Sequence, residues 1–188
     1  MFDALIVGGG AAGLSCALVL GSAKEKAFAK NKHIGIIVHQ RASHLQSALF
    51  NNALGLAPGT TGASILENGK AQLATLYPHI LQVDKEKVLE IKRGSQNFTV
   101  VTNKASYEAK IVVVAVGYTN LINIKGLESY IESHPRAIAA KNRIWLKNVN
   151  HLIETGLYVA GTLAGWRSQF AIASGSGAQV ATDILTLE

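Results

Sequence analysis

Residues 4 to 13 read Ala-Leu-Ile-Val-Gly-Gly-Gly-Ala-Ala-Gly, an apolar run that ends in a cluster of glycines. The run from Phe2 to Val7 does not alternate with polar residues, which is typical of a strand covered on both faces of a parallel sheet. From Ala11 onward, small and apolar residues recur at helical spacing. The stretch therefore predicts a central parallel strand, a tight turn and a helix.

Each glycine of this turn has its own physical role. Gly8 permits the tight turn after the strand, Gly10 lets the backbone approach a pyrophosphate, and Gly13 lets the helix pack closely. Backbone N–H groups of the first helical turn, at Ala11 and Ala12, would face the anion. This interpretation competes with an ordinary glycine-rich turn between a strand and a helix.

A second apolar run, from Ile34 to Val38, completes a strand–helix–strand unit and favours the dinucleotide-binding interpretation. We expect the helix in between to be buried at first and solvated through the basic stretch Lys24 to Lys32.

The end of this second strand departs from the usual dinucleotide-binding pattern. An acid that binds a ribose hydroxyl normally stands about 20 residues beyond the glycines. This chain has His39 and Gln40 instead, and either side chain can hydrogen-bond a hydroxyl without the charge of a carboxylate. The next residue, Arg41, suits the 2′-phosphate of NADP, and His39 can also be read as a plain polar strand end.

The middle of the chain predicts further elements. Thr60 or Thr61 caps a helix that ends near Tyr77 and Pro78. Short strands are expected at 80–83, 88–91, 98–101 and 107–109 as an antiparallel meander, and at 111–116 as a return to the parallel sheet. Residues 118–156 are weakly patterned, with a short helix expected near 127–131 and a strand at 144–146.

Composition restricts the class of protein. Hydrophobic residues make up 48% of the 188 positions and charged residues 16%, so we expect a single domain spanning residues 1–188. The net charge of +6 suits an anionic ligand, whereas the scattered lysines and arginines argue against nucleic acid. The histidines lack metal-ligand spacing, so no metal is expected. Neither a signal peptide nor a membrane span is indicated, which favours a cytoplasmic protein.

A second motif stands near the other end of the sequence. Gly156-Leu-Tyr-Val-Ala-Gly161-Thr162 is followed by a helix-like stretch that begins near Ser168 or Gln169. Together with the first motif and Val113-Val-Ala-Val-Gly117, this pattern resembles the FAD domain of the thioredoxin-reductase-like, FAD-dependent pyridine nucleotide-disulfide oxidoreductases. The resemblance covers nearly the whole chain, and Asn51 to Gly59 occupies the place of that family's loop near the flavin.

The resemblance implies an α/β fold, a three-layer Rossmann-like FAD/NAD(P)-binding domain with a central parallel sheet and a small antiparallel β-meander. It also implies FAD as the cofactor. The FAD-binding residues that it implies are Gly8, Gly10, Ala11, Ala12, Gly13, His39, Gln40, Arg41, Asn52, Val83, Ala115, Val116, Gly117, Gly161, Thr162, Ser168, Gln169, Phe170 and Ala171. Trp166 and Arg167 stand beside the last group and are further candidates for the flavin ring, or plain surface residues.

Three departures qualify the resemblance. In complete members an NADPH domain lies between the second and closing glycine motifs, but Gly117 and Gly156 are only 39 positions apart. Thr162 replaces the acid of the closing motif. The single cysteine, Cys16, excludes an internal redox disulfide and reads as a core residue.

The sequence thus predicts an FAD-binding flavoprotein, an oxidoreductase that exchanges electrons with a small molecule or a partner protein. Two alternatives stay open: a flavin-binding module without turnover, and an NAD(P)-binding Rossmann protein. The apolar composition favours a homodimer over a monomer.

Overall fold

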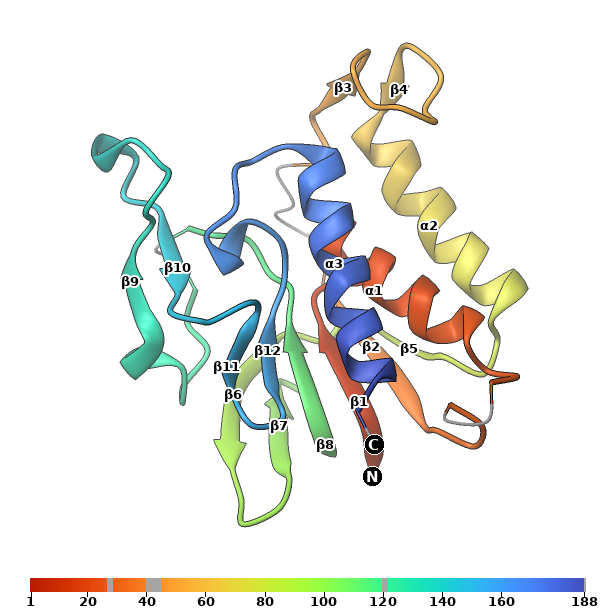
Figure 1. Cartoon of the computed structure of the whole chain (residues 1–188), viewed down its shortest axis with the longest axis vertical. Helices are drawn as coiled ribbons and strands as arrows, with labels where there is room; N and C mark the ends of the chain where they lie inside the picture. Colours follow the sequence, from red (N-terminus) through yellow and green to blue (C-terminus); the bar gives the residue numbers. More distant parts are fainter. Residues whose placement is uncertain (27–28, 40–44, 120–121, 188) are drawn as a thin grey trace.

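A mixed, eight-stranded sheet forms the centre of the computed structural model, which describes residues 1–26, 29–39, 45–119 and 122–187. Five strands of this sheet run parallel, in the spatial order β12, β8, β1, β2 and β5 (Figure 1). Their bounds are Leu157–Val159, Ser106–Val114, Phe2–Val7, Ile34–Val38 and Leu81–Asp84, respectively. The run from Phe2 to Val7 is therefore the inner strand that the sequence predicts.

Three helices cover one face of the sheet (Figure 1). They are α1 (Ala11–Ser22), α2 (Gly62–Leu76) and α3 (Phe170–Leu185). Their buried residues pack with one set of alternating strand residues, such as Ile6, Ile36 and Val113. None of the helices in the described ranges has the combined length and apolar character that a membrane crossing needs.

The opposite face is covered by strands and irregular chain. The antiparallel hairpin of β6 (Val88–Arg93) and β7 (Phe98–Thr102) packs on the other set of strand residues, as do Leu127 and Leu146. The smaller elements are β3 (Leu49–Phe50), β4 (Thr60–Thr61), η1 (Glu128–Tyr130), β9 (Ile131–Ser133), η2 (Ala139–Lys141), β10 (Ile144–Leu146), β11 (Leu152–Glu154) and η3 (Gly161–Ala164). The predicted three-layer α/β fold is confirmed.

Two helix predictions have different outcomes. Helix α2 begins after Thr61, whose hydroxyl accepts a hydrogen bond from Ser64 N, as the sequence predicts. Helix α1 ends at Ser22, so the expectation of a helix extending into the basic stretch was wrong. The described residues Lys24 to Lys26 are exposed, so they offer no apolar face that would hold a longer helix against the sheet.

Two strand predictions were also wrong. Strand β5 pairs in parallel with β2 and is not part of the meander, because α2 carries the chain over the sheet before β5 begins. Strand β8 runs unbroken from Ser106 to Val114, although two separate strands were expected. Its first half pairs with β7 and its second half with β1 and β12, so it joins the meander to the parallel sheet.

The parallel pairing places both sequence motifs at one edge of the sheet. Val7 lies beside Val114, and Val114 lies beside Val159, in register. The chain leaves all three residues at the carboxyl edge of the sheet, where ligands of open α/β sheets bind.

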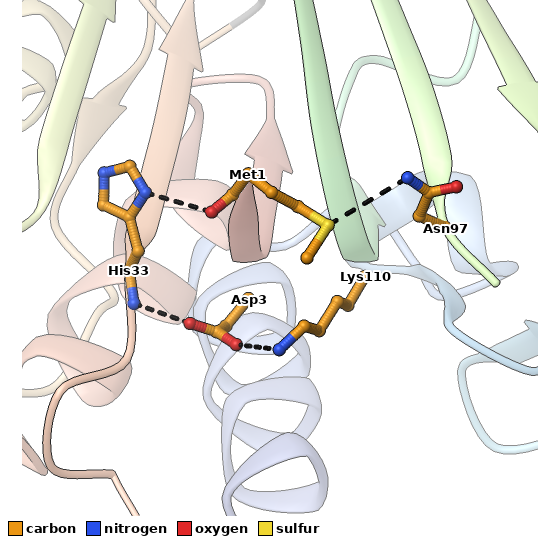
Figure 2. A network of polar contacts seen from close by, with 5 residues as sticks. All are labelled: Met1, Asp3, His33, Asn97 and Lys110. Carbon is orange, nitrogen blue, oxygen red and sulfur yellow. Dashed lines mark hydrogen bonds and ion pairs between the residues drawn. The ribbon is translucent and has the colours of Figure 1, made fainter.

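The opposite, amino edge of the sheet is tied by a polar network (Figure 2). The Asp3 carboxylate accepts a hydrogen bond from His33 N at 2.8 Å and pairs with Lys110 Nζ at 2.8 Å. His33 Nδ1 lies 3.2 Å from the carbonyl oxygen of Met1, and Asn97 Nδ2 contacts the Met1 sulfur. The network therefore links β1 to the chain before β2 and to β8, far from the carboxyl edge.

Burial raises the pKa of Asp3, but Lys110 and the His33 N–H lower it by more, so the net pKa is below the usual value. We expect Asp3→Asn to reduce the free energy of unfolding at pH 7 by about 1 kcal/mol. The folded state favours the charged carboxylate of Asp3, so the substitution has its whole effect on the free energy of unfolding above the unfolded pKa of ~3.9. As the pH falls through the folded pKa, Asp3 becomes protonated and this effect disappears. Urea denaturation at several pH values measures it, and a loss that grows on acidification would contradict this account.

Candidate cofactor site

A cleft of about 630 Å³ lies at the carboxyl edge. Its volume falls in the range of ligand sites, roughly 300–1,000 Å³. The residues predicted from the sequence that line it are Gly8, Gly10, Ala11, Ala12, His39, Ala115, Val116, Gly117, Gly161, Thr162, Ser168, Gln169 and Phe170. The fold therefore brings most of the predicted cofactor residues around one cavity, from both ends of the sequence.

The turn after β1 requires glycine at two positions. Gly8 has φ +115°, donates its N–H to Ile37 O at 2.9 Å, and leaves only 2.5 Å between a notional Cβ and Ala115 O. Gly13 does not line the cleft, and a Cβ there would overlap the carbonyl oxygen of Gly8. The two glycines thus let β1, α1 and the chain after β8 approach one another at backbone distance.

The N-terminus of α1 faces the cleft without a side-chain cap. Gly10 is the N-cap residue with no side-chain hydrogen bond, and the first turn contains no acid. The first N–H groups of a helix have no partner inside it, and this end carries a partial positive charge. Because Gly10, Ala11 and Ala12 line the cleft, these groups suit the pyrophosphate of a dinucleotide. A Cβ on Gly10 would meet no protein atom within 4 Å, so the cradle has free space there.

The closing motif is held by a buried polar network. Gly161, with φ +79°, donates its N–H to Ser176 Oγ at 2.7 Å. The Ser176 hydroxyl lies 3.5 Å from Nδ1 of His151, which donates to Val159 O at 3.0 Å. Ser176 and His151 are both buried, so they fix the turn between β12 and α3 from behind. Sequence analysis did not find this pair, because its members come together only in the fold.

A second buried histidine supports Thr162. His134 Nδ1 accepts a hydrogen bond from Arg136 N at 3.1 Å, so its Nε2–H donates to the carbonyl oxygen of Thr162 at 3.0 Å. Arg136 also donates to Gly165 O at 3.1 Å. The segment between η1 and β10 thereby anchors the cleft wall that carries Thr162.

The start of α3 contributes an aromatic pair. Helix α3 begins at Phe170 after Gln169, as the sequence predicts within a residue or two. The Phe170 ring lies 5.2 Å from the Phe50 ring, centroid to centroid, and both residues line the cleft. Sequence analysis missed Phe50, which precedes the predicted flavin loop by one residue. The pair provides an apolar aromatic surface at this end of the cleft.

Of the three residues predicted to act at the end of β2, one lies within the described ranges. His39 is exposed and lines the cleft, whereas Gln40 and Arg41 lie outside the described residues. Their predicted roles toward a ribose hydroxyl or a 2′-phosphate stay predictions.

Besides Gly13, three predicted residues within the described ranges do not line the cleft. Val83 of β5 is buried in the hydrophobic core on the meander side of the sheet, while Asn52 and Ala171 are exposed. The loop is closed by the preceding residue, Asn51, whose Oδ1 accepts from Gly59 N at 2.8 Å. The turn after β5 reaches the cleft instead, through Glu86, Lys87 and Val88.

The remaining candidates lie outside the cleft lining. Trp166 is 41% exposed and packs under the Arg136 guanidinium at 4.7 Å, and Arg167 is exposed. Cys16 is fully buried, which raises the pKa of its thiol to about 12 and keeps it protonated. Among the described residues, no group of three His, Cys, Asp or Glu side chains is placed to hold a metal ion.

The open parallel sheet, the glycine turn and the uncapped helix N-terminus at its carboxyl edge define a Rossmann-like, dinucleotide-binding protein. The protein belongs to the pyridine nucleotide-disulphide oxidoreductase family, whose model matches residues 2–169. This membership confirms the resemblance found in the sequence and FAD as the cofactor.

Individual relatives agree with this assignment. The chain is 29% identical over 143 residues to a ferredoxin–NADP reductase of Streptococcus gordonii, and 25% identical over 181 residues to ferredoxin–NADP reductase 1 of Bacillus cytotoxicus. These matches cover 71% and 94% of this chain but only 42% and 45% of the relatives, so the chain spans less than half their length.

Solved structures confirm the fold. An oxidoreductase from Agrobacterium tumefaciens superposes with a TM-score of 0.76 at 16% identity, covering 97% of each chain. The thioredoxin reductase of T. acidophilum gives 0.71 at 15% identity, covering 98% of each chain.

The glycine turn offers a matched pair of substitutions. Gly8→Ala forces a Cβ against Ala115 O at positive φ, so we expect a loss of about 2–4 kcal/mol in the free energy of unfolding. Gly10→Ala meets no protein atom, so we expect it to change stability by less than about 1 kcal/mol. Because its methyl group occupies the cradle, FAD affinity should still fall about tenfold. Urea denaturation and FAD titration measure both effects, and equal stability of the two variants would contradict the assigned geometry.

Proposed function

We propose that this protein is an FAD-dependent oxidoreductase that exchanges electrons with separate molecules, without an NADPH domain inside the printed sequence. The proposal concerns the activity and the partners. It builds on the family membership and on the structure of the segment between Gly117 and Gly156.

The segment between the second and closing glycine motifs carries the argument. Only 39 positions separate Gly117 from Gly156, and the described residues there form η1, β9, η2, β10 and β11. Leu127 and Leu146 of this segment are fully buried in the core on the meander side of the sheet. The segment therefore covers the sheet and props the cleft wall at Thr162, and it is far too short for a nucleotide-binding domain.

A dithiol relay is also missing from this sequence. Cys16 is its single cysteine and has no exposed sulfur for exchange with a partner. In the proposed function, electrons pass directly between the cofactor and a molecule that reaches the cleft.

Different residues around the cleft would bind different parts of FAD. The turn from Gly8 to Ala12 suits the pyrophosphate, and the aromatic pair Phe50 and Phe170 suits the flavin ring. FAD supplies the hydride and electron transfer when it is bound. The positive end of α3, beside Phe170, favours negative charge at the ring end of the cleft.

The charge of the chain favours an acidic partner. The net charge of +6 attracts an acidic electron-carrier protein by long-range electrostatics. Two relatives are named as ferredoxin–NADP reductases, which makes a ferredoxin-type carrier the first candidate.

Anaerobic reduction tests this function. The FAD-loaded protein is mixed separately with NADH, with NADPH and with a chemically reduced ferredoxin, and the visible flavin absorption is followed by stopped flow. We expect reduced ferredoxin to bleach the flavin faster than either nicotinamide. Absence of bleaching with all three would contradict the proposal and favour a flavin-binding module without turnover.

The aromatic pair provides a separate prediction. Phe170→Leu should lower FAD affinity by about tenfold, the scale of one aromatic contact. Trp166→Leu is the matched control, because Trp166 lies outside the cleft lining. Equal effects of the two substitutions would refute the placement of the ring beside Phe170.

A further inference from the structure

Glu86 lies close to the end of β2, where a ribose-binding acid normally stands, and lines the cleft. It lies in the turn between β5 and β6, just beyond the end of β5. Asp84 pairs with Val38, the last residue of β2, and Lys85 N donates to Val38 O at 2.9 Å. The turn thus stands directly beside the end of β2, where the sequence has His39 instead of an acid.

Glu86 is also the one carboxylate in the cleft lining, as far as the described residues go. The residue is only 9% exposed, which is unusual for an acid, and no ion pair with it is found among the described residues. The basic neighbours along the chain, Lys85 and Lys87, are exposed. A buried carboxylate that faces a ligand cavity is costly unless it has hydrogen-bond donors.

Two hydroxyl groups hold this carboxylate in place. Thr102 Oγ1 donates to Glu86 Oε2 at 2.6 Å, and the Tyr107 hydroxyl donates to the same oxygen at 3.1 Å. Burial raises the pKa of Tyr107, and Glu86 raises it further, so the phenol keeps its proton and remains a donor. The meander thereby fixes the Glu86 side chain through one of its two oxygens.

We propose that Glu86 binds the adenosine end of FAD, its second oxygen accepting a hydrogen bond from a ribose hydroxyl or from the adenine amino group. The inference rests on the proposed FAD site and adds the residue that selects the nucleotide. A carboxylate in this position accepts charge-assisted hydrogen bonds and repels a 2′-phosphate. It makes the cleft selective for an unphosphorylated adenosine ribose.

Titration calorimetry on the FAD-free chain tests the assignment. We expect Glu86→Gln to weaken FAD and ADP about 10- to 100-fold and to leave FMN binding unchanged. Glu90→Gln is the matched control, because it removes the same charge four residues away and outside this cleft, so its FAD and ADP affinities should equal those of wild type.

Four further ligands identify the donor and the charge effect. If the ribose 2′-hydroxyl is the donor, wild type should bind 2′-deoxy-ADP, which lacks it, more weakly than ADP. If the adenine amino group is the donor, wild type should bind IDP, which lacks that group, more weakly than ADP. Glu86→Gln should lose that discrimination. It should also narrow the preference for AMP over adenosine 2′,5′-bisphosphate, an effect that a purely structural role for Glu86 would not produce.

The outcomes separate this inference from the proposed function. If wild type binds FAD, and the ADP affinity of Glu86→Gln is within twofold of the wild-type ADP affinity, the inference fails and the flavoprotein assignment stands. Parallel losses of ADP and FMN affinity would also overturn it, since they indicate a general disturbance of the cleft. If Glu86→Gln does not fold, Glu86→Asp keeps the charge and should weaken ADP while still disfavouring the 2′-phosphate. Equal ADP affinity in Glu86→Asp and wild type would then overturn the inference.

Discussion

Backbone segments from distant parts of the chain meet at the carboxyl edge of the sheet with no space for side chains between them. Gly8 approaches Ala115 O so closely that a Cβ would lie 2.5 Å from it, and a Cβ on Gly177 of α3 would overlap Ala12 O of α1. These contacts bring both ends of the sequence to one cleft. The position of the helix N-terminus, the closing turn and the meander all depend on this close approach.

Some of this arrangement follows from the sequence by local physics. Runs of apolar residues, interrupted in β1 only by Asp3, identify β1 and β2, because a strand buried on both faces needs no polar alternation. The glycines at 8 and 13 predict the turn, because Gly8 has a positive φ and a Cβ at either position would meet backbone atoms, whereas Gly10 leaves open space at the helix N-terminus. Thr61 predicts the start of α2 through its hydroxyl. Each of these signals lies within a few residues of the feature that it predicts.

Other features depend on contacts between residues far apart in the sequence. The partner of β5 is decided by the crossover through α2, and the unbroken length of β8 by its two different neighbours. Phe50, Ser176 and His151 have no local motif, so their place around the cleft appears only in the fold. The same holds for Glu86, which a sequence search for an acid after β2 cannot find, because it lies in the turn after the neighbouring strand, β5.

The central claim is that both ends of this sequence build one FAD site. Equilibrium titration of the FAD-free chain with FAD, followed by flavin fluorescence with NADP⁺ titrated in parallel, tests it most directly. The account predicts one FAD per chain with micromolar or tighter affinity, and much weaker binding of NADP⁺. A chain that binds NADP⁺ but cannot be loaded with FAD would contradict it.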